Sequence, residues 1–281
     1  MRRFEVSAAS PLRNLWVLCV SVVHLLVSFS PQRHRVPKLR EQSTAGRTGA
    51  ASTGHMMRVK ICGTRNVEEA RMIAASGADA LGFLVGLLEP HPDQIAAEEA
   101  AEIIVRLPSF VSSVLVTQQR DPHIVADLCR RARASAVQLH GGFASEQIPT
   151  LRRELPALTV IQVVPVAGPD ARAAAEDAAI LADAILLDSA PAGRAALGGG
   201  TGKTHDWNLS REIARACSKP VILAGGLTPE NVELAIQTVG PSAVDVHSGV
   251  EDSQGNKAKE KLLRFVTRAR QAFDLTARAM L

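Results

Sequence analysis

The chain has 281 residues but very few aromatic ones: seven Phe, two Trp and no Tyr. Proteins that hold single-stranded nucleic acid stack the bases on such rings, so this chain has little material for a platform of that kind. Its four cysteines, Cys19, Cys62, Cys129 and Cys217, lie far apart, without the spacing of a zinc ligand set or a redox dithiol. Nothing calls for a metal, a nucleotide or a flavin, and a reducing compartment such as the cytoplasm is favoured.

The excess of positive charge is confined to one end of the chain. The whole chain carries 32 Lys and Arg against 28 Asp and Glu, a net charge of +4. Residues 1–55 hold eight of the basic residues and two of the acidic ones, so the remainder has a net charge of −2. Proteins that bind nucleic acid usually carry a basic patch on the folded part, so no such partner is predicted.

Residues 1–55 differ in kind from the rest of the chain. They have a basic start, an apolar run at 15–29 and then a stretch rich in Ser, Thr, Gly and Arg. The apolar run is shorter than the ~20 residues that span a bilayer, so no membrane anchor is predicted. A signal peptide, a transit peptide for an organelle and a start codon assigned too early are all open, the last because Met56 and Met57 directly precede the first strand. We expect a disordered leader, a folded domain over 57–275 and a tail at 276–281.

From residue 59 onward, short β-branched runs alternate with longer segments of helical periodicity. The strands are predicted at residues 59–62, 80–85, 111–117, 136–140, 159–166, 184–189, 220–226 and 243–249. Helices lie between them, for example at 67–76 with Asn66 as N-cap and at 97–107. Near-continuous apolar strands are typical of a parallel sheet buried on both faces, so the eight units predict an α/β fold, a single (β/α)8 TIM barrel. An open doubly wound sheet is the alternative, but no G-x-G-x-x-G follows the first strand.

The loops after the seventh and eighth strands carry glycines. In such barrels the active site lies at the carboxyl ends of the strands, and these two loops often bind phosphate through backbone N–H groups. The candidates are Gly225, Gly226, Ser248 and Gly249. Glycine lets the backbone approach a phosphate, and the Ser248 hydroxyl adds a donor. The alternative is that Gly226 and Gly249 only turn the chain out of the barrel, but their occurrence on neighbouring strands favours phosphate.

A glycine-rich segment at 199–204 ends in Gly202, Lys203 and Thr204. It is similar to a nucleotide P-loop, but Leu197 stands where that motif requires its first glycine. A mobile loop that covers a substrate, with Lys203 reaching the ligand, is the better interpretation.

Cys62 and Asp188 end the first and sixth strands. A thiol and a carboxylate on opposite sides of a barrel mouth can act as general base and general acid on one small molecule. The alternatives are structural, because a Cys at a strand end is often a small buried hydrophobe and an Asp often caps a loop. His140 and His247 also lie at strand ends, where a hydrogen-bonded structural role is the more common one.

Six segments carry recognisable motifs. They read VKICG at 59–63, VQLHG at 137–141, LDS at 187–189, GGTGKTHDW at 199–207, LAGGL at 223–227 and DVHSGVE at 245–251. In order and spacing, from about Met57 to Phe273, the chain resembles the phosphoribosylanthranilate isomerase family of tryptophan biosynthesis. The resemblance implies a ribulose-phosphate-binding barrel and a cofactor-free Amadori rearrangement, in which N-(5-phosphoribosyl)anthranilate becomes 1-(2-carboxyphenylamino)-1-deoxyribulose 5-phosphate.

The resemblance also implies a role for each site residue. Asp188 would protonate the furanose ring oxygen as the sugar ring opens to a Schiff base, and Cys62 would remove the proton from C2 of the sugar. The phosphate would be held by Gly225, Gly226, Ser248 and Gly249. The rest of the substrate would be contacted by Gln138, His140 and Asp245, together with Lys203.

The chain departs from the family pattern at its substrate-holding residues. Segment 86–94, after the second strand, lacks the Arg of the family's Ser-Pro-Arg-like motif. The anthranilate carboxylate then lacks this partner unless Arg65, His91 or Lys203 replaces it. In addition, His205 stands where Phe is usual, His247 where a small residue is usual, and Ala258 where an acidic residue is expected.

These departures leave two alternatives open. One is a divergent paralogue that isomerises another ribosyl phosphate with the same acid and base, and the other is a phosphate-binding barrel without catalysis. A small sugar phosphate is the predicted partner in every case, and the chain is expected to be a monomer or a homodimer.

Overall fold

The computed structural model describes residues 57–189 and 204–279. The predicted leader, the glycine-rich loop and Lys203 lie outside the described residues. The predicted boundary between the folded domain and a tail at residue 276 falls within the last helix, which ends at Ala279. These domain boundaries stay predictions.

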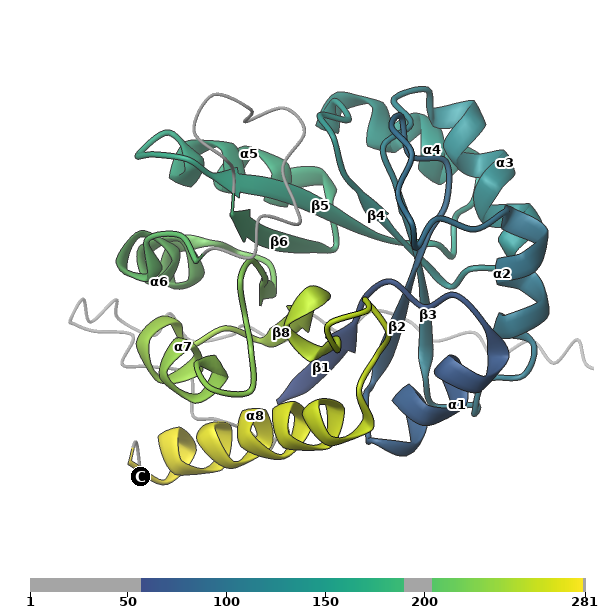
Figure 1. Cartoon of the computed structure of the whole chain (residues 1–281). Helices are drawn as coiled ribbons and strands as arrows, with labels where there is room; N and C mark the ends of the chain where they lie inside the picture. Colours follow the sequence, from purple (N-terminus) through teal and green to yellow (C-terminus); the bar gives the residue numbers. More distant parts are fainter. Residues whose placement is uncertain (1–56, 190–203, 280–281) are drawn as a thin grey trace, which may run out of the picture. The chain divides into compact units, whose positions relative to one another are not determined.

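Eight parallel strands form a closed barrel, in which each strand pairs with the next along the chain and the last pairs with the first (Figure 1). Their bounds are β1 Arg58–Ile61, β2 Ala80–Leu84, β3 Ser112–Thr117, β4 Ala136–Leu139, β5 Thr159–Val166, β6 Ala184–Ser189, β7 Val221–Leu223 and β8 Ala243–Val246. The predicted (β/α)8 barrel is confirmed, and the open sheet is excluded because β1 pairs with β8.

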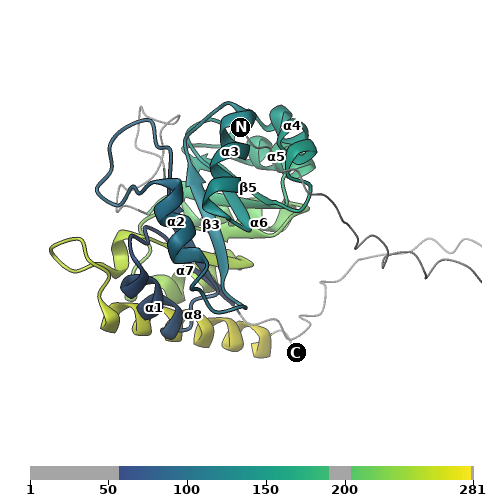
Figure 2. The same ribbon diagram turned by 90° about the vertical axis from the view of Figure 1, so that its right-hand side faces the viewer.

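A helix follows each strand and lies outside the barrel (Figure 1, Figure 2). The helices are α1 Val67–Ala75, α2 Ala97–Ile104, α3 Pro122–Ala132, α4 Ile148–Glu154, α5 Ala171–Leu181, α6 Trp207–Ala216, α7 Val232–Val239 and α8 Lys259–Ala279. Asn66 caps α1 as predicted, because its side chain accepts a hydrogen bond from the Glu69 N–H at 2.9 Å. No helix within 57–189 and 204–279 is long and apolar enough to cross a membrane.

The hydrophobic core has two layers. The larger lies between the strands and the surrounding helices and includes fully buried side chains such as Phe83, Leu115 and Phe265. A smaller cluster inside the barrel contains Leu186 and Ile222 among other residues. Nearer the carboxyl ends of the strands, polar and charged residues such as Gln138, Asp188 and Asp245 join apolar ones such as Leu84 and Val116. The polar side chains at this end of the barrel suit the binding of a ligand.

The structure shortens two of the predicted strands. β7 ends at Leu223 rather than 226, and β8 ends at Val246 rather than 249. Gly225 and Gly226 have φ of +81° and +63°, which no extended strand allows. Ser248–Val250 forms a 3-10 turn, η3. Both motifs therefore lie in loops at the mouth of the barrel.

Candidate active site

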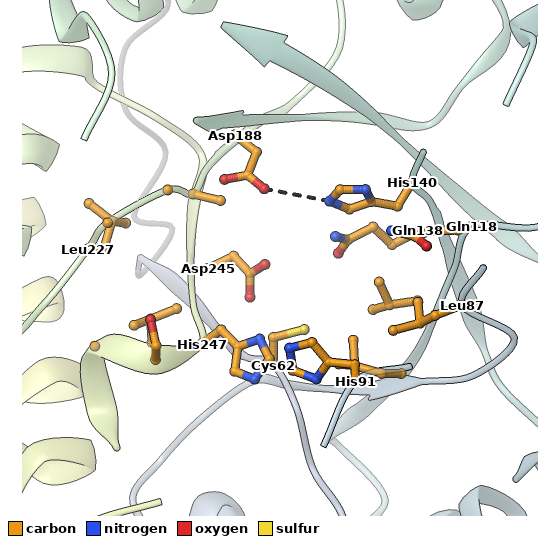
Figure 3. A pocket seen from close by; sticks show the side chains of 18 residues that line it. Cys62, Leu87, His91, Gln118, Gln138, His140, Asp188, Leu227, Asp245 and His247 are labelled. Atoms are coloured by element: carbon orange, nitrogen blue, oxygen red, sulfur yellow. Dashed lines mark ion pairs between the residues drawn. The ribbon is translucent and has the colours of Figure 1, made fainter. Parts of the chain in front are cut away.

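One pocket opens at the carboxyl ends of the strands (Figure 3). Leu84, Leu87 and Val116 form an apolar part of its wall. Nine of the ten predicted site residues line it: Cys62, Gln138, His140, Asp188, Gly225, Gly226, Asp245, Ser248 and Gly249. The tenth, Lys203, lies outside the described residues. Residues that are up to 187 positions apart in the chain thus share one cavity.

Cys62 follows β1 and its side chain is buried. Its N–H donates to the Val246 carbonyl at 2.9 Å, which holds it beside β8. Gly82 on β2 makes room for the thiol, because a Cβ at Gly82 would lie 2.9 Å from the Cys62 sulfur. Burial raises the pKa of the Cys62 thiol above its ordinary value, while the nearby Lys60 ammonium opposes that shift.

Lys60 and Asp245 form a buried ion pair beside this thiol. They are register partners on β1 and β8, so their side chains leave the same face of the barrel. The Lys60 ammonium lies 2.9 Å from both carboxylate oxygens of Asp245. Burial would lower the pKa of Lys60, but the charges of Asp245 and Cys62 and the hydrogen bonds to both together outweigh burial and raise it. The pair therefore places a fixed positive charge close to the sulfur.

Asp188 lies across the pocket from Cys62 (Figure 3). One of its oxygens accepts a hydrogen bond from the Ser189 N–H at 2.7 Å, and the other lies 3.6 Å from Nε2 of His140. His205 is held between two hydroxyls, with Nδ1 3.1 Å from Ser189 and Nε2 2.7 Å from Ser210. Burial lowers the pKa of His205. A carboxyl group with one oxygen fixed and one facing the cavity is suited to deliver a proton.

The loops after β7 and β8 approach each other closely at the mouth. A Cβ at Gly225 would lie 2.2 Å from the Ser189 hydroxyl, and one at Gly249 only 1.9 Å from the Leu227 carbonyl oxygen. Packing alone thus requires glycine at both positions, and Gly249 is one of the two glycines, with Gly226, for which a purely structural role was the alternative. No described residue accepts a hydrogen bond from the N–H groups of Gly225, Gly226, Ser248 or Gly249. These donors remain available to an anion at the pocket wall.

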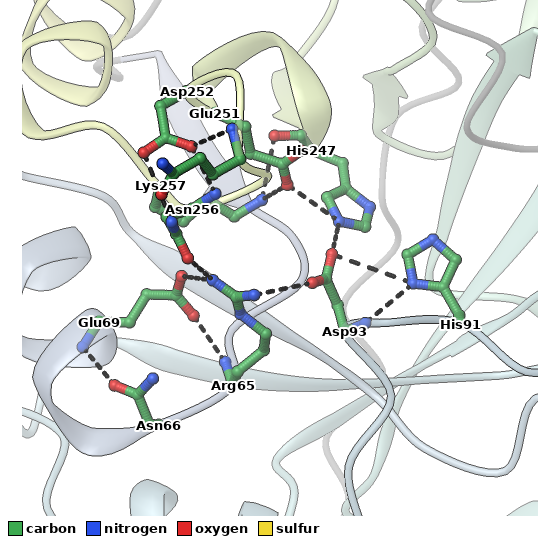
Figure 4. A network of polar contacts seen from close by, with 11 residues as sticks. Arg65, Asn66, Glu69, His91, Asp93, His247, Glu251, Asp252, Asn256 and Lys257 are labelled. Atoms are coloured by element: carbon green, nitrogen blue, oxygen red, sulfur yellow. Dashed lines mark hydrogen bonds and ion pairs between the residues drawn. The ribbon is translucent and has the colours of Figure 1, made fainter.

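A polar network supports the wall formed by the β8 loop (Figure 4). Nε2 of His247 lies 2.7 Å from Asp93 and 3.4 Å from Glu251, and the Lys257 ammonium lies 2.6 Å from the same Glu251 oxygen. Arg65 lies 3.5 Å from the other Asp93 oxygen. Burial would raise the pKa of Asp93, but the hydrogen bond from His247 and the nearby cations outweigh it, so the pKa is lowered.

Asp93, His247 and Glu251 each offer a possible metal ligand, and the three atoms lie within 4.8 Å of one another. The Glu251 oxygen is already bound by Lys257, and Asp93 already faces Arg65. Their charges are therefore offset by two fixed cations, so the contacts are those of a salt-bridge network.

The sequence left open whether Arg65 replaces the missing Arg, but Arg65 does not lie at the pocket. It is held by Glu69, Asn256 and Asp93 and does not line the pocket, whereas His91 does. Sequence reasoning also missed Lys60 and Asp93 as parts of the site. The one signal for Lys60 was a charged residue inside an apolar strand. Asp93 had none, because its partner His247 is 154 positions away.

Comparisons with known proteins identify the family of the chain. The family model described as N-(5'phosphoribosyl)anthranilate (PRA) isomerase matches residues 59–268. An N-(5'-phosphoribosyl)anthranilate isomerase of Methanocella arvoryzae is 44% identical over 215 residues, covering 76% of this chain and 99% of the relative. Isomerase 2 of Methanosarcina mazei is 40% identical over 217 residues, covering 77% and 96%.

Solved structures give the same result. The crystal structure of phosphoribosyl anthranilate isomerase from Thermotoga maritima has a TM-score of 0.68 and 36% identity, covering 77% of this chain and all of that chain. A phosphoribosyl anthranilate isomerase in complex with reduced 1-(o-carboxyphenylamino)-1-deoxyribulose 5-phosphate has a TM-score of 0.64 and 34% identity, with the same coverage. The family model and these relatives, together with the fold and the pocket, show that the chain belongs to the N-(5'-phosphoribosyl)anthranilate isomerase family.

Proposed function

We propose that Cys62 and Asp188 are the general base and the general acid of the family's reaction, the isomerisation of N-(5'-phosphoribosyl)anthranilate. The observation that carries this assignment is their placement on opposite sides of a single pocket (Figure 3). An Amadori rearrangement needs one group to protonate the sugar ring oxygen and another to remove the C2 proton. Cys62 and Asp188 can supply both without a cofactor.

Asp188 acts first. Its oxygen that faces the cavity donates a proton to the furanose ring oxygen, the C1–O bond breaks and a Schiff base forms between C1 and the anthranilate nitrogen. The Ser189 N–H at the other oxygen fixes the orientation of the carboxyl group. His140, 3.6 Å from Asp188, can stabilise the carboxylate that remains after proton transfer.

Cys62 acts second. Its thiolate removes the proton from C2, the electron pair moves to C1 and neutralises the iminium nitrogen, and an enolamine forms. Tautomerisation then gives the ketone at C2. The Lys60 ammonium stabilises the thiolate in this buried position, because its positive charge lowers the pKa of Cys62 more than the charge of Lys257 does.

The phosphate binds at the loops after β7 and β8. The N–H groups of Gly225, Gly226, Ser248 and Gly249, which have no acceptor among the described residues, support this assignment. Gln138 and Asp245, on β4 and β8, contact the sugar between the phosphate and the two catalytic groups. The buried Oε1 of Gln138 has no described hydrogen-bond partner, which suits a group that waits for a ligand donor. Lys203 completes the contacts to the substrate.

The test is turnover of phosphoribosylanthranilate generated in solution and followed by the decay of its fluorescence. Cys62→Ala and Asp188→Asn should each lower kcat by about 10²- to 10⁴-fold, since each removes one proton-transfer group. Cys217→Ala, a half-buried cysteine at the end of α6, is the matched control and should keep full activity. Near-normal rates in either catalytic variant, with a folded protein, would remove that residue from the mechanism.

The remaining expectations concern the partners, the compartment and the oligomeric state of the protein. The net charge of −2 beyond residue 55 supports a function without nucleic acid. Three free cysteines, Cys62, Cys129 and Cys217, support a reducing compartment, the cytoplasm or the interior of an organelle. A monomer or a homodimer is proposed, and one relative of known structure, from Thermotoga maritima, is described as dimeric.

A further inference from the structure

The substrate of the proposed function carries two anionic groups, a phosphate on the sugar and a carboxylate on the aromatic ring. The N–H groups of the β7 and β8 loops can bind one of them. The second must find donors elsewhere in the pocket, because a carboxylate that leaves water without partners loses several kcal/mol. The inference that follows rests on the proposed function and assigns those donors.

Among the described residues that line the pocket, only His91, His140 and His247 can carry a positive charge. His140 faces Asp188 and belongs to the acid side of the pocket. His91 and His247 come from two different loops, after β2 and after β8, yet their ring centroids are 5.5 Å apart. Figure 3 shows the two rings side by side next to Cys62.

His247 is oriented by the network behind it (Figure 4). Its Nε2 faces the Asp93 carboxylate at 2.7 Å and Glu251 at 3.4 Å, so Nε2 carries a hydrogen. Gly63 leaves room for the ring, since a Cβ there would lie 2.3 Å from Nε2. The other ring nitrogen, Nδ1, has no partner among the described residues.

The His247 ring lies against two carboxylates. Its Nε2 faces Asp93 and Glu251, and the Lys257 ammonium lies 2.6 Å from the same Glu251 oxygen. Because Nε2 carries the hydrogen that faces these carboxylates, Nδ1 donates to a ligand only from the doubly protonated ring. An anionic ligand group at Nδ1 favours that form, since the ring then lies between the ligand and the two carboxylates.

His91 supplies a second donor in a neutral form. Its Nδ1 accepts the Asp93 N–H at 3.2 Å, so the ring hydrogen must be on Nε2. Burial lowers the pKa of His91, and the neighbouring His247 lowers it further, which keeps the ring neutral. The two histidines thus offer one N–H each, from rings that Asp93 holds in place.

We propose that His247 and His91 bind the carboxylate of the anthranilate ring and that Asp93 positions both imidazoles for this contact. The apolar side chains of Leu84, Leu87 and Val116 line the same pocket and suit the aromatic ring that bears the carboxylate. This histidine pair takes the place of the Arg that segment 86–94 lacks. Asp93 is a positioning residue, since it reaches the ligand only through the two rings.

The test compares two ligands that do not turn over. One is reduced 1-(o-carboxyphenylamino)-1-deoxyribulose 5-phosphate, and the other is the same molecule with a phenyl ring that lacks the carboxylate. Dissociation constants are measured by calorimetry for the full chain, for His247→Gln, His91→Ala and Asp93→Asn, and for His123→Ala, an exposed histidine on α3 that serves as the control.

The wild type and His123→Ala should bind the carboxylated ligand about 10- to 100-fold more tightly than the other one, as expected for hydrogen bonds to a charged group. His247→Gln should remove most of that preference and leave affinity for the ligand without the carboxylate unchanged. His91→Ala should remove a smaller part. Asp93→Asn should also reduce the preference, although Asp93 touches neither ligand.

An unchanged preference in folded His247→Gln and His91→Ala overturns the assignment. If His247→Gln weakens the binding of both ligands equally, the assignment is also overturned, because the ring would then contribute to phosphate binding or to the stability of the fold. If the wild type binds neither ligand, the proposed function itself is wrong. If the wild type binds both ligands equally, only the carboxylate site fails.

Discussion

Cys62 has two opposing influences on its reactivity. Burial in the barrel mouth raises the pKa of its thiol, and so does the Asp245 carboxylate, whereas Lys60 lowers it. Because Lys60 and Asp245 are paired, removal of one leaves the other uncompensated beside the sulfur. The fraction of Cys62 in the thiolate form therefore depends on Lys60, a residue that need not touch the substrate.

This environment predicts the pH dependence of the enzyme. A base with a raised pKa is mostly protonated at neutral pH, so kcat/KM should increase with pH and level off only above the ordinary range of a thiol. In Lys60→Gln the loss of the ammonium should move that limb to higher pH. A pH profile of kcat/KM measures both effects.

The double variant Lys60→Gln/Asp245→Asn is the control for that profile. It removes the cation that lowers the pKa of Cys62 and the anion that raises it, so its limb should lie closer to that of the wild type. A flat profile in the wild type, or the same limb in Lys60→Gln, would contradict the role of Cys62 as the base.

At the level of single residues, the convergence of the candidate residues on one pocket could be predicted, and the contacts that support them could not. Cys62, Asp188 and Gln138 were predictable because residues at the carboxyl ends of barrel strands face one cavity whatever their distance in the chain. Lys60 precedes such an end by two positions, and Asp93 acts through a loop. Their importance depends on partners that only the closed fold brings within 3 Å.

At the level of elements, the loops after β7 and β8 combine tight packing with the proposed phosphate site. The β8 loop approaches the β7 loop so closely that the carbonyl of Leu227 occupies the space of a side chain at Gly249. The same approach brings N–H groups of both loops to one wall of the pocket. Packing and binding therefore place the same demand on Gly249, and the two interpretations made from the sequence are compatible.

Gly249→Ala should separate the loops. The added Cβ would lie 1.9 Å from the Leu227 oxygen, so one loop must move, at a cost of about 1–3 kcal/mol of unfolding free energy. We expect weaker binding of the phosphate-bearing product analogue and a lower thermal midpoint, measured by calorimetry and circular dichroism.

Gly168→Ala is the matched control for that variant, because a Cβ at Gly168 meets nothing within 4 Å. It should bind the analogue with wild-type affinity. Unchanged binding in Gly249→Ala would show that this loop does not hold the phosphate.

The predicted strand boundaries agree with the structure for the long strands and disagree with it where a strand ends in a turn. The bounds of β5 and β6 agree with the prediction, because neighbouring elements pack against both faces of these strands and fix which residues are extended. The ends of β7 and β8 were placed three residues too far along the chain. Each strand continues into residues that line the pocket wall, and the sequence pattern alone did not show where the extended backbone ends.

At the level of the whole molecule, the barrel closes by the pairing of β1 with β8. Within the described residues, α8 packs against both α7 and α1 and so completes the ring of helices. The chain divides by compactness into residues 1–50 and 51–281, with the barrel in the second unit. A domain of this size, with a two-layered core, has enough buried surface to be stable alone.

A chain of residues 57–281 should therefore fold and bind the product analogue like the full chain. Its thermal midpoint should agree within the ~2–4 °C that corresponds to about 1 kcal/mol for a domain of this size. Thermal unfolding followed by circular dichroism, with and without the analogue, makes the comparison. A broad transition or lost binding in the shorter chain would show that the leader contributes to the folded domain.

The amino-acid pattern alone was sufficient for the architecture and for the convergence of Cys62 and Asp188 on one pocket. Eight repeats of an apolar strand and an amphipathic helix allow few ways to bury their surface, and strand ends converge by geometry. The pattern could not reveal the pairing of Lys60 with Asp245 or of Asp93 with His247. Such contacts depend on barrel closure and on loop conformation, since they join positions 185 and 154 residues apart, and no local periodicity records them.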